Sequence, residues 1–334
     1  MLRHRAHMRA SLRFPALALA ALVLALASAE PGSPQLDALL ELRPTIDPRG
    51  ALADVWTRPA GGGGGYCAFV GVACDSGRNV VALDFEGWGW LGGALPPASA
   101  LAALPRLRVI NFDDNGMAGT LPPDWGGLGS LEEIRLGTNS LTGPIPPEWA
   151  GLSKLRVLHL HWNRLSGSLS PEFGAGWPLL EELSLDTNGF EGRLPEEMAR
   201  LTRLKTLLLH DNQLSGTLSP AFGGGWPRLE VMTLYHNQLT GPLPAEWGAM
   251  TKLRQLFIFG NKLTGPLPAS WAGLKSLAAV DLSDNDLEGG VPPPWGGLGK
   301  HLRTLRLGGN GRLDACGALP KGLEKLEVPV AKCP

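Results

Sequence analysis

Long apolar stretches are scarce in this sequence. After residue 29, glycine, proline or a charged residue interrupts every stretch well before the roughly 20 apolar residues that a membrane helix needs. An excess of one charge is also lacking, because 30 basic and 31 acidic side chains give a formal net charge of -1, and no basic tract occurs. This balance argues against bulk attraction to nucleic acid or an anionic membrane. We therefore expect a soluble mature chain that binds neither.

Catalytic motifs are absent as well. The sequence contains no zincin HExxH motif, no Ser-His-Asp signature, no dinucleotide-binding fingerprint and no kinase signature after its repeats. The glycines at 61–65 predict a flexible surface loop and not a phosphate-binding loop, because no Gly-Lys-Ser/Thr follows them. These absences predict a protein that is not an enzyme and that carries no cofactor.

One pattern recurs along most of the chain, and residues 253–268, LRQLFIFGNKLTGPLP, are one of its clearest copies. With Asn261 as position 0, apolar residues stand at -8, -5, -3, +2 and +6, glycine at +4 and proline at +7. The frame recurs every 24 or 25 residues around a row of asparagines: Asn115, Asn139, Asn163, Asn188, Asn212, Asn237, Asn261, Asn285 and Asn310. Such a period indicates a stack of one supersecondary unit, because each copy is too short for a core of its own.

Each copy is predicted to open with a short strand, because positions -5 and -3 follow the two-residue period of extended chain. The asparagine can then satisfy backbone groups where the chain leaves the strand, since its amide both donates and accepts hydrogen bonds. Glycine at +4 and proline at +7 exclude a long helix and predict an extended or 3₁₀ return path. The predicted fold is an α/β repeat solenoid, with strands on one side and an irregular return on the other.

The frame LxxLxLxxNxLxGxLP resembles the leucine-rich repeat. Its LxGxLP half is similar to the plant-type subclass found in extracellular receptors and in secreted inhibitors of wall-degrading enzymes such as polygalacturonase. The resemblance covers about ten repeats over residues 80–314 and an N-terminal cap over 30–79. It implies a right-handed horseshoe with a parallel concave β-sheet, an irregular or 3₁₀ convex side and a cap at each end. The N-terminal cap resembles the family through Cys67, Gly71, Val72 and Cys74, but Phe69 stands where the family often has tryptophan.

Residues 1–29 read as a secretory signal peptide. Arginines precede an apolar run over residues 14–27, and the small residues Ala27 and Ala29 are spaced for cleavage after Ala29. The run is short for a membrane anchor, and a transit peptide remains an alternative because the segment is rich in arginine and free of acids. We expect a secreted protein of the extracellular space or cell wall. The lack of any N-x-Ser/Thr acceptor differs from the heavily glycosylated extracellular relatives.

Four cysteines in an exported chain are expected to form disulfides. Proximity in the sequence favours Cys67 with Cys74 and Cys316 with Cys333, one pair at each end, and the other two pairings remain open. The second pair would lie in a C-terminal cap over residues 315–334, where the repeat pattern decays.

Large apolar residues recur at position +10: Trp125, Trp149, Phe173, Met198, Phe222, Trp247, Trp271 and Trp295. We interpret this row as a packing spine on the convex side, where no helix fills the space, and not as a platform for sugars.

Function is expected at positions -6, -4, -2 and -1, which the core does not need. In the middle of the solenoid these positions hold aromatic and imidazole side chains together with one carboxylate: His159, His161, Trp162, Asp186, His210, Tyr235, His236, Phe257 and Phe259. Rigid rings in a concave centre are typical of an interaction hot spot. The alternative is that these residues merely favour strands.

A metal site is a second possibility for the same region. His161, Asp186 and His210 occupy one position on three neighbouring strands, and two imidazoles with a carboxylate can ligate zinc. The outer two are separated by two strand spacings, about 9.6 Å, which is long for a shared ion. We therefore predict no metal.

The predicted function is the non-covalent recognition of a protein or peptide through the concave face. Alternatives are the inhibition of wall-degrading enzymes, binding of a wall polysaccharide, a metal-dependent activity at the histidines and a structural role in the wall. Because histidine changes charge near neutrality, affinity is expected to shift between about pH 5 and 7.5. The oligomeric state and the identity of the ligand do not follow from the sequence.

Overall fold

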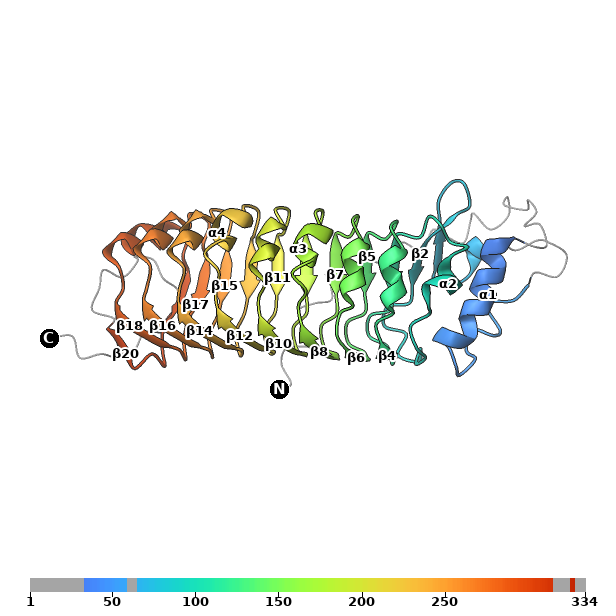
Figure 1. Ribbon diagram of the computed structural model, residues 1–334, viewed down its shortest axis with the longest axis horizontal. Coiled ribbons are helices and arrows are strands. Elements are labelled where there is room, and N and C mark those ends of the chain that lie inside the picture. Colours follow the sequence, from blue (N-terminus) through green and yellow to red (C-terminus); the bar gives the residue numbers. More distant parts are fainter. Residues whose placement is uncertain (1–32, 59–64, 315–324, 328–334) are drawn as a thin grey trace.

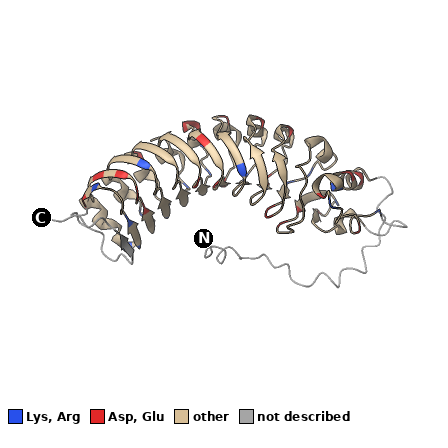
Figure 2. Cartoon of the chain, turned by 90° about the horizontal axis from the view of Figure 1, so that it is seen from below, with Lys and Arg blue, Asp and Glu red and all other residues tan. Residues whose placement is uncertain are grey.

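The computed structural model describes residues 33–58, 65–314 and 325–327. The expected signal peptide, most of the glycine run, and Cys316 and Cys333 lie outside the described residues. The described chain forms a long stack of repeats (Figure 1). The stack bends into an arc, with one row of short strands along its inner side (Figure 2).

The inner row is a 12-stranded sheet in the described part of the chain, and each strand except the first pairs in parallel with its neighbours. Its strands are mostly three residues long and occupy positions -6 to -4 of the repeat. In spatial order they are β1 (Val72–Cys74), β2 (Val80–Asp84), β3 (Val109–Asn111), β5 (Glu133–Arg135), β7 (Val157–His159), β9 (Glu182–Ser184), β11 (Thr206–Leu208), β13 (Val231–Thr233), β15 (Gln255–Phe257), β17 (Ala279–Asp281), β19 (Thr304–Arg306) and β21 (Lys325–Glu327). The predicted parallel sheet is confirmed.

A second parallel sheet runs along the stack, where the sequence predicted only extended chain. It has nine strands among the described residues: β4 (Ala118–Thr120), β6 (Ser140–Gly143), β8 (Arg164–Ser168), β10 (Gly189–Arg193), β12 (Gln213–Thr217), β14 (Gln238–Pro242), β16 (Lys262–Pro266), β18 (Asp286–Gly290) and β20 (Arg312–Asp314). The glycine at +4 lies inside these strands with φ between 75° and 89°. Glycine is required there because other L-residues rarely adopt such a conformation.

Short helical turns form the convex side. The 3₁₀ turns are η1 (Tyr66–Ala68), η2 (Pro123–Gly127), η3 (Pro147–Gly151), η4 (Glu196–Arg200), η5 (Ala245–Ala249), η6 (Ala269–Gly273) and η7 (Pro293–Lys300). The α-helical segments are α1 (Pro34–Ile46), α2 (Ala98–Leu101), α3 (Phe173–Gly176) and α4 (Phe222–Gly225). Of these elements, α1 and η1 belong to the N-terminal end of the stack and not to its convex side. Two of the 25-residue copies contain α3 and α4, because the extra residue allows an i to i+4 hydrogen bond in place of an i to i+3 bond.

The convex tryptophans are buried, which agrees with their interpretation as packing residues. Trp149 and Trp271 have 0% exposure, and each indole N–H donates to a backbone carbonyl of the preceding repeat, on Pro122 at 2.8 Å and Pro244 at 2.9 Å. Rings of adjacent repeats stack, as with Trp271 and Trp295, whose planes differ by 6°. The spine therefore both fills the core and satisfies buried polar groups.

The asparagines connect consecutive repeats. Asn237 donates from Nδ2 to the carbonyl of Leu209 in the preceding repeat at 3.0 Å and to Leu234 at 3.1 Å, and its Oδ1 accepts from the N–H of Leu214 at 2.9 Å. The same pattern occurs at the other repeat asparagines except the first, Asn115, whose Oδ1 is buried without a hydrogen-bond partner in the described residues. The first repeat has Trp88 in the asparagine position and one extra residue before Leu95, and it is irregular at the position that would donate to Asn115.

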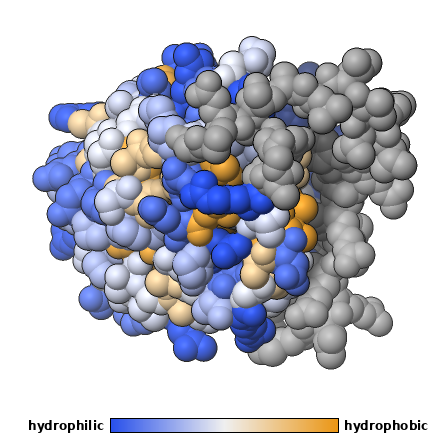
Figure 3. Space-filling model, turned by 90° about the vertical axis from the view of Figure 1, so that its right-hand side faces the viewer, coloured by the Kyte–Doolittle hydropathy of each residue, from blue (hydrophilic) through white to orange (hydrophobic). Residues whose placement is uncertain are grey.

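The N-terminal end is covered by α1 and by a loop that a disulfide between Cys67 and Cys74 closes. This pairing is the one that sequence proximity favoured. Leu39, Leu42 and Ile46 of α1 have 0% exposure and join the continuous core of the repeats. Seen from this end, hydrophilic side chains occupy most of the visible surface, with apolar residues between them (Figure 3). The cap thus shields the apolar end that every solenoid would otherwise expose.

Candidate functional site

The residue before each asparagine, at position -1, has an unusual backbone. Its φ lies between 51° and 54° at seven non-glycine positions: Asp114, Thr138, Trp162, Thr187, Asp211, His236 and Asp284. The left-handed conformation costs roughly 1–2 kcal/mol per residue, and the hydrogen bonds of the following asparagine help to hold it. Trp162 at this position exposes 60% of its surface. The repeat therefore presents -1 side chains to the inner surface.

Three rings at position -2 form a stack in the middle of the concave face. The ring centroids of His210 and Tyr235 are 4.2 Å apart, and those of Tyr235 and Phe259 are 4.4 Å apart with an interplanar angle of 6°. His236 lies edge-on to Tyr235 and Phe259 at 5.2 and 5.0 Å. We call His210, Tyr235 and Phe259, with His236 beside them, the ring stack. Neighbouring parallel strands are about 4.8 Å apart, so identical positions naturally bring rings to stacking distance.

Polar neighbours fix His210 at one end of the ring stack. Its Nδ1 lies 2.8 Å from Thr233 Oγ1, and its Nε2 lies 3.4 Å from Asp186 Oδ2. Asp186 is buried and accepts a hydrogen bond from the hydroxyl of Ser184 at 2.6 Å. Burial lowers the pKa of His210, and the attraction of Asp186 opposes this shift only in part. The ring is therefore held in one orientation and favours its neutral form.

The other side chains of the ring stack are also constrained. His236 Nδ1 lies 2.8 Å from Asp211 Oδ1. Burial, with smaller contributions from Asp211 and Asp186, raises the pKa of Tyr235 to about 12. The phenol therefore remains protonated near neutral pH and can donate a hydrogen bond to a ligand.

His159 and His161 form a separate group. Arg135 Nη1 lies 3.0 Å from His159 Nδ1, and His159 Nε2 lies 3.1 Å from Glu182 Oε2, a contact that lowers the pKa of Glu182. The His161 ring covers Gly137, where an added Cβ would come within 2.3 Å of the ring. His161 Nδ1 is buried and has no hydrogen-bond partner in the described residues. Burial raises the pKa of Asp113, whose charge His161 partly stabilises.

The remaining predicted aromatic residues, Trp162 and Phe257, stand apart from the ring stack. Trp162 makes no ring contact within the described chain, and Phe257 is the half-buried last residue of β15, beside Asp281 of β17. The structure therefore brings together four of the predicted aromatic or imidazole residues and spreads the others along the face.

The structure does not bring together the three residues considered for a metal site, His161, Asp186 and His210. Asp186 lies near His210, whereas the ring of His161 lies over Gly137. Within the described ranges, no group of three or more histidine, cysteine, aspartate or glutamate side chains is placed to hold a metal ion.

Sequence reasoning did not predict the contacts that hold the histidines. Arg135, Glu182, Thr233 and Asp211 contact His159, His210 and His236 from neighbouring strands. The repeat frame did contain a signal for these contacts. Each partner stands one repeat away from its histidine, at the same or a nearby position of the frame, so the two side chains lie on neighbouring strands.

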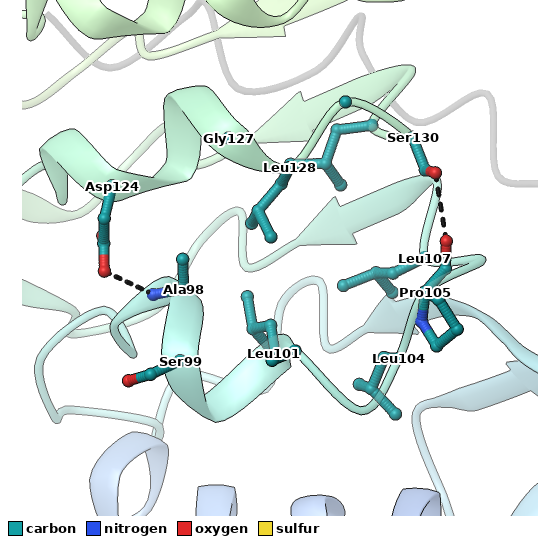
Figure 4. Close-up of a pocket in the computed structure, with 13 residues that line it drawn as sticks. Ala98, Ser99, Leu101, Leu104, Pro105, Leu107, Asp124, Gly127, Leu128 and Ser130 are labelled. Atoms are coloured by element: carbon teal, nitrogen blue, oxygen red, sulfur yellow. Dashed lines mark hydrogen bonds between the residues drawn. The ribbon is translucent and has the colours of Figure 1, made fainter.

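A pocket of about 460 Å³ lies elsewhere, between α2 and the turn η2 (Figure 4). It occurs at position +10 of the irregular first repeat, where Ala98 stands in place of a large ring. Two of its polar side chains already have partners, since Asp124 accepts from the N–H of Ala98 at 2.8 Å and Ser130 donates to the carbonyl of Pro105 at 3.0 Å. The pocket is a packing defect next to the core leucines, and the concave face remains the candidate site.

Comparisons with known proteins agree with this architecture. A family model described as "Leucine rich repeat" matches residues 203–263, and a second model of the same description matches residues 130–152 and 154–175. The chain is 32% identical over 106 residues to Receptor-like protein kinase 7 of Arabidopsis thaliana, a match that spans 31% of this chain and 10% of that protein.

Solved structures show the same solenoid. The ectodomain of the Arabidopsis thaliana receptor kinase GASSHO1/SCHENGEN3, in complex with Casparian strip integrity factor 2, has a TM-score of 0.74 and 29% identity, over 86% of this chain and 33% of that one. The Arabidopsis receptor kinase HAESA, in complex with the peptide hormone IDA and the co-receptor SERK1, has a TM-score of 0.68 and 27% identity, over 88% and 53%. A plant ice-binding protein shares the fold at 24% identity and a TM-score of 0.65, over 90% of this chain and 99% of that one.

The chain thus spans about a third of the GASSHO1/SCHENGEN3 structure and about half of the HAESA structure. The asparagine-centred repeat, the LxGxLP second half that forms a second sheet, and these matches lead to one assignment. The chain is a leucine-rich-repeat solenoid, and its fold resembles the ectodomains of plant receptor kinases, including one solved with a peptide hormone.

Proposed function

We propose that the chain is an extracellular, non-catalytic recognition module that binds a peptide or protein segment through its concave face. The ring stack is the observation that supports this most. Its three stacked rings are half-buried, held by their neighbours and placed at the centre of a rigid sheet. Rings that are already ordered lose little entropy on binding, so that more of the contact energy contributes to affinity.

The relatives give independent support. The HAESA structure contains a peptide hormone, and it shares the solenoid with this chain at 27% identity. The disulfide between Cys67 and Cys74 is of the kind that persists in an oxidising extracellular environment. In the residues that the structure describes, no helix is both long and apolar enough to cross a membrane.

A displayed random-peptide library provides the test. Peptides selected on the purified full chain are measured against wild type and against a Trp162→Ala, Tyr235→Ala, Phe257→Ala variant. A matched control carries Thr142→Ala, Gln238→Ala and Thr240→Ala, three exposed positions on the second sheet. Circular dichroism and thermal unfolding establish that both variants fold.

We expect selected peptides to lose about 100-fold or more in affinity for the concave variant, since truncation of a hot-spot residue costs about 2 kcal/mol or more. The control variant should bind as wild type does. Equal loss in both variants, or unchanged binding to the concave variant, would exclude the central concave face. Saturable binding of a wall polysaccharide or of a polygalacturonase, with no peptide recovered, would favour the alternative functions.

A further inference from the structure

Trp162 and His236 carry the only rings at position -1 of the repeats, and both are more than half exposed. Trp162 exposes 60% of its surface, and the side chain of His236 exposes 56%. Because both residues have the same repeat position and nearly the same φ, 52° and 51°, their Cα–Cβ bonds leave the backbone in the same way. The concave face therefore presents two exposed rings that lie three repeats apart.

The ring of His236 is held by its neighbours. Its Nδ1 lies 2.8 Å from Asp211 Oδ1, and its plane is nearly perpendicular to the rings of Tyr235 and Phe259, at 5.2 and 5.0 Å. Gly260 leaves room for the imidazole, because a Cβ there would lie 2.6 Å from His236 Cδ2. The exposed ring is thus ordered before a ligand arrives, which lowers the entropy lost on binding.

The distance between the two rings favours one kind of chain. Three strand spacings separate them, about 14 Å along the solenoid. In an extended peptide, side chains i and i+4 leave the same side of the chain about 13 Å apart. Side chains on one side of a polyproline II helix are about 9 or 19 Å apart, and those of an α-helix about 10.5 or 16.5 Å. An extended segment that runs along the solenoid matches the spacing best.

The concave face also carries an excess of negative charge. At positions -6, -4, -2 and -1, between residues 82 and 309, two side chains are basic and ten are acidic: Asp84, Glu86, Asp113, Asp114, Glu133, Glu182, Asp186, Asp211, Asp281 and Asp284. The two basic side chains are already paired, Arg135 with Glu133 at 2.9 Å. Arg306 pairs with Asp281 at 3.4 Å. Since the whole chain is nearly balanced in charge, this face favours a basic partner.

Asp211 stands between the two rings, one repeat before His236. Its side chain is 41% exposed, and no lysine or arginine of the described residues forms an ion pair with it. The other residue at position -1 between the rings is the short Thr187. Side chain i+2 of an extended segment points to the same side as i and i+4 and lies midway between them. A basic group at i+2 therefore comes near the carboxylate of Asp211.

We propose that the concave face binds an extended peptide segment with aromatic residues at i and i+4 and a lysine or arginine at i+2. One aromatic side chain packs on Trp162 and the other on His236, and the cation between them pairs with Asp211. The inference rests on the proposed function, because it names the class of peptide that the face recognises.

Synthetic peptides of one composition and different spacing test the proposal. Ac-TTFTKTFTT-amide has phenylalanine at i and i+4 with lysine at i+2, and its threonines favour an extended chain. Ac-TTFTKFTTT-amide and Ac-TTFTKTTFT-amide place the second phenylalanine at i+3 and i+5, and Ac-TTFTETFTT-amide reverses the charge. Each is titrated into the full chain and followed by saturation-transfer NMR. We expect the first peptide to bind about tenfold more tightly than each of the other three.

Three variants and a control locate the contacts. Trp162→Ala and His236→Ala should each remove the preference for the i+4 spacing, because only one ring remains. Asp211→Asn should reduce the preference for lysine over glutamate about threefold or more, since asparagine still accepts from His236 and tolerates the left-handed backbone. Thr138→Ala, at an exposed -1 position one repeat before Trp162, should bind all four peptides as wild type does.

Equal affinity for the three spacings, or an i+4 preference that persists in Trp162→Ala, would overturn the proposal. The absence of binding by all four peptides would do the same. Library peptides that need the concave face but carry no aromatic pair at i and i+4 would also count against it, while leaving the proposed function standing. Library peptides that bind the Trp162→Ala, Tyr235→Ala, Phe257→Ala variant as well as wild type would remove the proposed function itself.

Discussion

Leu234 shows at the level of one residue how strictly the repeat separates the core from the concave face. Leu234 is 1% exposed at position -3, whereas Tyr235, the next residue, is half-buried in the ring stack. One peptide unit thus divides a position that tolerates only apolar atoms from one that is free for recognition.

Leu234→Asp should lower the free energy of unfolding by about 3–5 kcal/mol, because it buries a carboxylate with no partner. Gln238→Asp, at an exposed position four residues later, is the matched control and should change it by less than about 0.5 kcal/mol. Urea unfolding followed by circular dichroism compares the two. Equal stability of both variants would show that the register assigned to this repeat is wrong.

His210 should make stability depend on pH. Its folded-state pKa is lower than the unfolded value of about 6.5, because burial disfavours the charged ring. Near pH 6 the unfolded chain therefore binds more protons at this site than the folded chain does. The stability that His210 contributes is fully present above about pH 6.5 and is lost as the pH falls toward the folded pKa.

The measurement is the urea midpoint at pH 7.5 and pH 5.5 for wild type and for His210→Gln. We expect wild type to lose more stability on acidification than the variant does, and the difference between them isolates His210 from the carboxylates. A larger loss in the variant would mean that Asp186, 3.4 Å away, outweighs burial and raises the pKa of His210 instead.

At the scale of the repeat element, the side chain of the asparagine at position 0 links each repeat to the one before it by hydrogen bonds. Asn237 donates to carbonyls in two repeats and accepts from a third group, whereas Asn115 only donates. The difference arises from the irregular first repeat. The chain therefore offers two asparagines at the same repeat position, one with and one without the accepted hydrogen bond, that can be compared.

Asn237→Ala should cost roughly 3 kcal/mol, because the N–H of Leu214 and the carbonyls of Leu209 and Leu234 lose their buried partner. Asn115→Ala should cost less, because its carbonyl oxygen has no hydrogen bond to lose in the described structure and is itself a buried polar atom. Chemical denaturation of the two variants tests the order. A larger cost at Asn115 would contradict the role of the two-way amide.

For the whole molecule, stability is distributed along one dimension. Each repeat packs mainly on the repeats before and after it, so an end can open while the middle stays folded. The disulfide at Cys67 and Cys74 lies at one such end and joins residues seven apart.

The Cys67→Ser, Cys74→Ser variant should therefore lose stability locally, by about 2–3 kcal/mol, at α1, β1 and β2. Hydrogen exchange followed by mass spectrometry should show faster exchange there and unchanged protection from β11 to β15, the strands beside the ring stack. A uniform loss of protection along the chain would indicate that the solenoid unfolds as one cooperative unit.

Much of this architecture follows from the sequence because its cause is local and repeated. Apolar positions around Asn237 or Asn261 must face one core in every copy, so the period alone predicts strands, the asparagine connections and the buried tryptophans such as Trp271. For the residues of the second sheet the sequence predicts only extended chain, because they are mostly polar and their glycines resemble turn signals. That it is a sheet depends on hydrogen bonds between repeats.

The site divides in the same way. The sequence determined which residues reach the concave face, since this follows from the repeat position of Tyr235 or Phe259. Only the tertiary structure decided which of them are in contact. His210, Tyr235 and Phe259 stack on one another, whereas the ring of His161 lies over Gly137 and is not part of this stack. The physical reason is that side-chain rotamers respond to partners one strand away, such as Thr233 and Asp186 for His210. Those partners are about 25 residues distant in the chain and become neighbours only when the repeats stack.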